Sequence, residues 1–60
     1  MITSFRIQTP AGGREVYSPG LIVGNRVYWT RETDRPGAPI DTRLLPVTAR
    51  RRDVVAAFRK

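Results

Sequence analysis

The pair Gly24-Asn25 limits what this chain can fold into more than any other feature of its sequence. Strand-favouring runs lie on both sides of the pair, Leu-Ile-Val before it and Arg-Val-Tyr-Trp-Thr after it. Two turn-forming residues between such runs are typical of a tight antiparallel β-hairpin. This pairing sets Ile22 opposite Val27, so these two side chains and Trp29 are expected on one face. A hairpin is therefore the expected centre of the fold.

The residues before this hairpin also favour strands. Residues 4–9 alternate apolar and polar side chains, which is the pattern of a half-buried strand. The Pro-Ala-Gly-Gly stretch that follows has a length used in hairpin loops. Residues 14–18 can then return as a second strand, and Pro19-Gly20 is expected to be the next turn.

The residues after the hairpin are less regular. Residues 33–39 contain two prolines and a glycine, which predicts a loop. Residues 40–47 are compatible with a short fourth strand, or with a single helical turn capped by Asp41. Pro46 keeps this segment at a sheet edge in either case. The sequence leaves the two alternatives open.

The last residues, 48–60, favour a basic amphipathic helix. Thr48 is a suitable N-cap, and Val54 and Phe58 fall on one side of the helix at the spacing of a buried stripe. Arg51 interrupts this apolar stripe, so a later start with Asp53 as the cap is the alternative.

Together these segments predict one small domain, 1–60, of the α+β class and mostly β. An antiparallel sheet of three to four strands is expected within 1–47, followed by the C-terminal helix. The chain has neither cysteine nor histidine, so it forms no disulfide and lacks the usual ligand sets for zinc. Small domains without such supports often gain stability from oligomers, so a homodimer is among the expected states. The expected core is Phe5, Ile7, Val16, Ile22, Val27, Trp29, Leu44, Val54 and Phe58.

Groups able to carry catalysis are scarce. Without histidine or cysteine, Ser4 and Ser18 have no activating partner of the usual kind. Glu32 and Asp34 are close together, but two carboxylates on a flexible loop make a poor cation site, and pairing with the neighbouring Arg31 and Arg35 is expected instead. We therefore expect no enzymatic activity, no catalytic residue, no metal site and no cofactor.

Nothing in the sequence points to export or to a membrane. The first residues lack the basic start and apolar run of an export signal, and no apolar stretch is long enough to span a bilayer. A cytoplasmic protein is expected.

Positive charge is concentrated near the carboxyl end. Of the formal net charge of +6, residues 1–42 carry +1 and residues 43–60 carry +5. Frequent Arg, Ala, Gly, Pro and Val are typical of a GC-rich genome, so the preference for arginine over lysine says little. The clustering is more informative, because codon bias would spread the arginines evenly. Such a concentrated positive field attracts polyanions or acidic protein surfaces.

Binding of DNA or RNA is the favoured interpretation, through contacts to backbone phosphates with little reading of the bases. Tyr17 and Tyr28 beside Arg26 are candidates for a base-stacking platform on the sheet, with Arg14 and Arg31 as further sheet-side contacts. The expected nucleic-acid-binding residues are Arg50, Arg51, Arg52, Arg59, Lys60, Arg26 and Tyr28.

The alternative is a small protein-binding adaptor or inhibitor. Such a protein would dock its basic helix on an acidic partner surface, or add a strand at an exposed sheet edge. Many short reading frames in the mobile genetic elements of bacteria and phages encode proteins of this kind.

Overall fold

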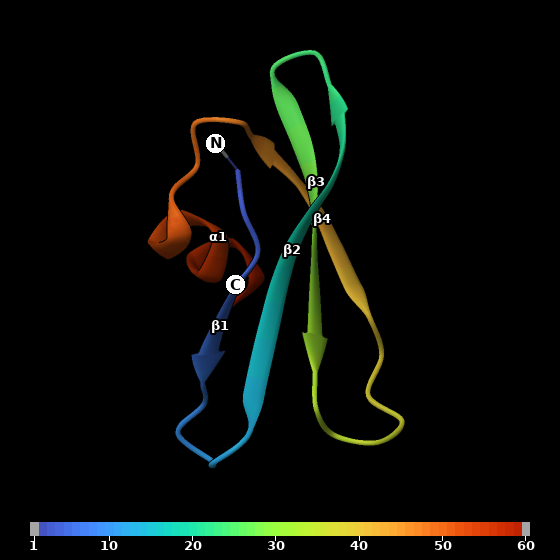
Figure 1. Cartoon of the computed structure of the whole chain (residues 1–60), viewed down its shortest axis with the longest axis vertical. Coiled ribbons are helices and arrows are strands. Elements are labelled where there is room, and N and C mark those ends of the chain that lie inside the picture. The colour runs from blue at the N-terminus through green and yellow to red at the C-terminus, as the bar shows by residue number, and fades with distance from the viewer. Residues whose placement is uncertain (1, 60) are drawn as a thin grey trace.

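Four antiparallel strands form one sheet, and a single helix lies against one of its faces (Figure 1). This computed structural model describes residues 2–59. The strands are neighbours in the order of the sequence, so β1 and β4 are the two edges. The expected α+β class, with a C-terminal helix, is confirmed. The elements are β1 (Phe5–Gln8), β2 (Arg14–Val23), β3 (Arg26–Thr33), β4 (Asp41–Pro46) and α1 (Arg51–Phe58).

The hairpin predicted around Gly24-Asn25 joins β2 to β3. Ile22 pairs with Val27 as expected, and Gly24 has a positive φ of 61°, a conformation that glycine adopts without a steric penalty. The turn expected at Pro19-Gly20 is wrong, because β2 continues through both residues. Its pairing with β3 shifts between Pro19 and Ile22, which marks a β-bulge. A bulge accommodates a proline and a glycine without ending the strand.

The structure decides between the alternatives for residues 40–47 and for the start of the C-terminal helix. Residues 40–47 contain the edge strand β4, with Pro46 as its last residue. The C-terminal helix begins at Arg51, so neither expected cap is right. Arg50 is the N-cap, and its backbone N–H donates to the Asp53 carboxylate over 3.0 Å. An acid in the first turn satisfies a free backbone donor and suits the helix dipole.

The core lies between the sheet and α1. Five of the expected core residues are buried there together with Tyr17, which was not expected. The Tyr17 ring stacks on that of Phe5, with ring centres 5.0 Å apart, and meets the edge of Phe58 at 5.5 Å. These aromatic contacts fix how the helix sits on the sheet. The buried core residues are Phe5, Tyr17, Val27, Trp29, Val54 and Phe58.

Four expected core residues are not part of this buried set. Ile7 is partly buried and packs against the core, and Val16 is partly buried but alternates with the buried Tyr17, so it lies on the opposite face of the sheet. Ile22 and Leu44 are 58% and 40% exposed. The hairpin end of β2 and β3 extends beyond α1 (Figure 1), and nothing within residues 2–59 covers the other face of the sheet. One short helix is too small to cover the hairpin end as well as the centre of the sheet, and it cannot cover the opposite face.

Candidate nucleic-acid interface

The buried carboxylate of Glu15 neutralises arginines near the end of α1. Glu15 is only 6% exposed. Its Oε1 accepts hydrogen bonds from Arg59 Nη2 at 2.9 Å and from the Tyr17 hydroxyl at 2.8 Å, and its Oε2 lies 3.6 Å from Arg31 Nη1. Arg59 is one of the expected phosphate contacts, yet it is already paired. The period-two pattern of β2 could have indicated this site, since it puts Glu15 and Tyr17 on one face.

Asp41 at the start of β4 neutralises two further arginines. Its Oδ2 lies 3.5 Å from Arg31 and 3.8 Å from Arg43. Both guanidinium groups also lie over the Phe58 ring, with their Cζ atoms 5.3 and 5.7 Å from its centre. Arg31 therefore faces the helix and pairs with Glu15 and Asp41, and the expected pairing of Arg31 with Glu32 and Asp34 is wrong.

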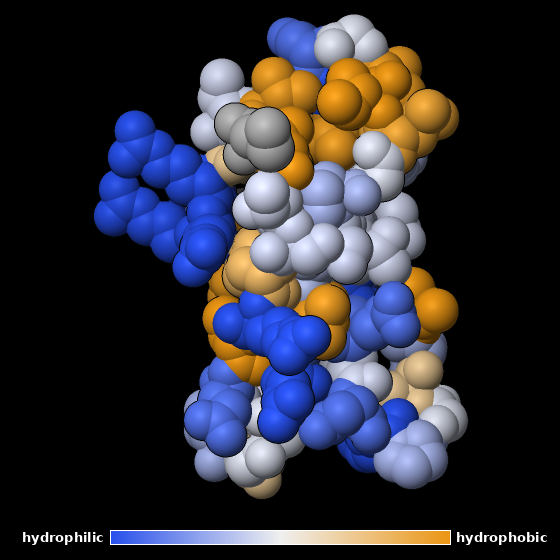
Figure 2. Space-filling view, viewed as in Figure 1, coloured by the Kyte–Doolittle hydropathy of each residue, from blue (hydrophilic) through white to orange (hydrophobic). Residues whose placement is uncertain are grey.

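Three consecutive arginines at the start of α1 have a different environment. Arg50, Arg51 and Arg52, here called the basic cluster, are exposed, and none of their side chains forms an ion pair within residues 2–59. Arg51 lies over the Phe5 ring, with its Cζ 5.5 Å from the ring centre. Figure 2 shows long hydrophilic side chains standing out from the surface beside α1. This part of the helix presents three positive charges beside one acid, Asp53, whose carboxylate accepts from the Arg50 backbone N–H and forms no ion pair with the three side chains.

The expected sheet-side contacts do not join the basic cluster. Arg26 and Tyr28 alternate with the buried Val27 and Trp29 on β3, so they lie on the face of the sheet opposite α1. The expected stacking platform of Tyr17 and Tyr28 does not exist, because Tyr17 is buried against the helix. Both residues lie on strands, but alternation places them on opposite faces. The last expected contact, Lys60, lies outside the described residues.

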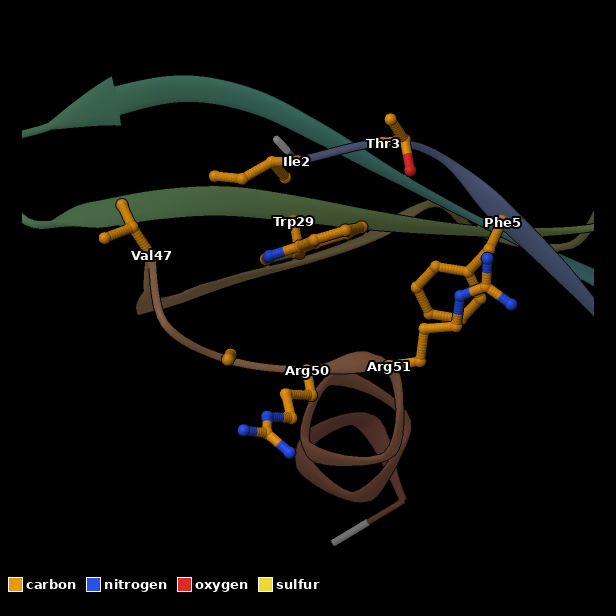
Figure 3. A pocket seen from close by; sticks show the side chains of 8 residues that line it. Ile2, Thr3, Phe5, Trp29, Val47, Arg50 and Arg51 are labelled. Atoms are coloured by element: carbon orange, nitrogen blue, oxygen red, sulfur yellow. The ribbon is translucent and has the colours of Figure 1, made fainter.

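A cavity of about 380 Å³ opens beside the basic cluster (Figure 3). It lies between the segment before β1 and the connection from β4 to α1, and Trp29 of β3 forms part of its wall. The strand and helix patterns gave no sign of it, since irregular segments form most of its rim. Its lining residues are Ile2, Thr3, Phe5, Trp29, Val47, Ala49, Arg50 and Arg51.

Residues 2–59 bring no group of three or more acidic side chains together in a way that could hold a metal ion. Over the same range, no helix has the length and apolar character needed to cross a membrane. Comparison with known proteins gives no match to a protein-family model, to a curated protein or to a solved structure.

Proposed function

We propose that this protein is a small, non-enzymatic, cytoplasmic nucleic-acid-binding protein that contacts the phosphate backbone through the basic cluster. The observation that carries the proposal is the grouping of three adjacent, exposed arginines whose side chains form no ion pair within residues 2–59. Arg31, Arg43 and Arg59 share two carboxylates, and the arginines at positions 6, 14, 26 and 35 form no ion pair in this range but are far apart in the sequence. Free guanidinium groups bind phosphate oxygens in a bidentate geometry.

The proposed binding is electrostatic and reads little sequence. Arg51 and Arg52 lie about 100° apart around the helix, and Arg50 precedes it as the N-cap in an extended conformation. The three side chains therefore leave the start of α1 in different directions and would follow a backbone rather than fit into one groove. Contact with three phosphates would release counterions and give a slope of log affinity against log salt of about −2.7 for duplex DNA. Affinity would then fall about 40-fold between about 50 and 200 mM salt.

The test is a salt titration of binding to random duplex and single-stranded DNA and RNA. The triple variant R50A/R51A/R52A is expected to flatten the salt slope to near zero while keeping a native circular dichroism spectrum, because the three side chains are exposed. The matched control is R6A/R14A/R35A, which removes the same formal charge from three exposed arginines elsewhere. An equal loss of affinity in both variants would contradict the proposal, because binding would then depend on the net charge or on arginines outside the basic cluster.

A protein-binding adaptor is the second candidate, and a separate observation favours it. Leu21, Ile22 and Val23 are exposed at the β2–β3 hairpin, with Leu44 and Tyr28 on the neighbouring strands. Figure 2 shows hydrophobic surface gathered at that end of the molecule. Large exposed apolar patches are typical of protein interfaces. Absence of salt-dependent nucleic-acid binding, together with specific capture of one acidic protein from cell extract, would favour this candidate.

A further inference from the structure

Trp29 carries a hydrogen-bond donor that has no acceptor in the described chain. The residue is only 4% exposed, yet no hydrogen bond within residues 2–59 uses its indole N–H. No side-chain nitrogen or oxygen in this range is both sealed from solvent and unpartnered. The indole nitrogen therefore has to reach open space. Trp29 lines the cavity, and Figure 3 shows its nitrogen at the end of the ring nearest Val47.

The exposed lining of the rest of the cavity is mostly polar, with a smaller apolar part and two arginines at its edge. Ile2, Val47 and Ala49 supply apolar surface, and Arg50 and Arg51 come from the start of α1. The guanidinium of Arg51 is held over the Phe5 ring, which limits the conformations it must lose on binding. A volume of about 380 Å³ falls in the range of small-molecule sites, about 300–1,000 Å³. A solvent-accessible indole donor, a mostly polar lining and two neighbouring arginines together suit an anion with a flat part that bears hydrogen-bond acceptors.

We propose that this cavity receives one unpaired nucleotide of a bound single strand. The indole N–H of Trp29 donates to an acceptor on the base, and Arg50 and Arg51 contact the adjacent phosphate. The inference rests on the proposed nucleic-acid binding and assigns it a substrate class. Every base offers a carbonyl oxygen or a ring nitrogen as an acceptor, so the site tolerates many sequences. A base within a duplex is stacked and paired, and would have to flip out to enter.

The experiment uses the fluorescence of Trp29, which is the single tryptophan of the chain. Four probes are titrated: a short oligothymidylate, a blunt GC duplex, inorganic phosphate and polyglutamate. Only the oligothymidylate is expected to change the emission, because only it can place a base against the indole. A change of similar size with phosphate or polyglutamate would overturn the inference, since the cavity would then accept an anion without a base.

Filling the cavity separates this inference from the proposed function. The variant A49L places a larger side chain in the cavity without altering any charge, and is expected to weaken oligothymidylate binding by at least about fivefold. Duplex binding is expected to stay within about twofold, because the basic cluster is unchanged. The matched control A56L makes the same substitution at an exposed position of α1 and is expected to change neither affinity.

Ala49 packs against the core, so A49L could lose its fold for reasons unrelated to binding. A second pair of variants therefore tests the cavity at an exposed position. Thr3 is exposed and lines the cavity, whereas the adjacent Ser4 is exposed and does not. T3F is expected to reduce oligothymidylate binding and S4F to leave it unchanged. If both the duplex and the single strand bind in a salt-dependent way while the emission and the T3F affinity stay unchanged, the cavity inference is wrong and the proposed function stands. If neither nucleic acid binds, both are wrong.

Discussion

Replacement of Glu15 by alanine is the sharpest test of how the helix is held on the sheet. The substitution removes the acceptor of the Tyr17 hydroxyl, which lies on a fully buried side chain. Loss of a hydrogen bond to a buried charged group costs about 1.5–3 kcal/mol. The ion pairs with Arg59 and Arg31 add less, about 1 kcal/mol together, because these side chains remain 46% and 24% exposed and Arg31 keeps Asp41 as a partner.

The expected cost of E15A is therefore about 3 kcal/mol, from the sum of these two contributions. A domain of this length has a free energy of unfolding of about 3–9 kcal/mol, so the variant should be close to its stability limit. Its midpoint of thermal unfolding should fall by about 12–24 °C. Urea unfolding followed by Trp29 fluorescence and by circular dichroism measures the change directly.

Two further variants separate the hydrogen bond of the Glu15 carboxylate from its charge. In E15Q the side-chain oxygen can still accept from Tyr17, so only the charge is lost and the expected cost is about 1 kcal/mol. The matched control E32A removes an exposed glutamate from β3 and should change the stability by less than about 0.5 kcal/mol. A cost for E15A below about 1 kcal/mol, or one equal to that of E15Q, would refute the assigned role of this carboxylate.

Asp53 at the start of α1 and the buried phenol of Tyr17 can each be tested by one substitution. D53N weakens the acceptor for the Arg50 backbone N–H and removes a favourable charge from the first turn of α1, so the free energy of unfolding should fall by about 0.5–1 kcal/mol. The substitution also removes the acid beside the basic cluster, so the affinity of the variant for duplex DNA should rise. A fall in this affinity would contradict the assigned interface. Burial raises the pKa of the Tyr17 phenol above its ordinary value of 10.0, and the hydrogen bond to Glu15 raises it further. The folded protein then keeps a proton that the unfolded chain loses. The contribution of Tyr17 to the free energy of unfolding should therefore be constant below about pH 10 and should fall above it, by up to about 1.4 kcal/mol per pH unit. Urea unfolding above about pH 10 should show a smaller fall for Y17F, and an equal fall would refute the role of the Tyr17 phenol.

Local patterns were enough to predict the sheet and the helix. Gly24-Asn25 predicted the central hairpin because a turn-forming pair lies between two strand-favouring runs. Val54 and Phe58 predicted the buried side of α1 because their spacing places them on one helical face. The turn expected at Pro19-Gly20 failed for a physical reason. β2 continues through both residues by forming a bulge. Its hydrogen bonds to β3 make this continuation favourable, and a pairing between strands cannot be inferred from the residues around the proline alone.

The location of the arginine partners could not be predicted from local sequence. Arg59 and Glu15 are 44 positions apart, and their ion pair exists only because α1 returns across β2. Likewise, alternation placed Tyr17 on one face of β2 but did not say which face the helix would cover. The sequence did predict the exposed basic cluster, because three consecutive charges cannot all be buried in so small a domain. The ion pairs of the other arginines depend on contacts between elements that are distant in the sequence.

The distribution of charge along α1 has a cost that packing does not explain. The first turn of a helix carries a partial positive charge, and a cation there is unfavourable by about 0.3–1 kcal/mol at low salt. The basic cluster places three guanidinium groups at this end, with Asp53 as the acid in that turn. Glu15 and Asp41 neutralise arginines near the other end instead. A fold selected only for stability would exchange these arrangements. Charge left free where it opposes the helix dipole therefore supports a binding role for the basic cluster, and an anionic ligand bound there would relieve the repulsion.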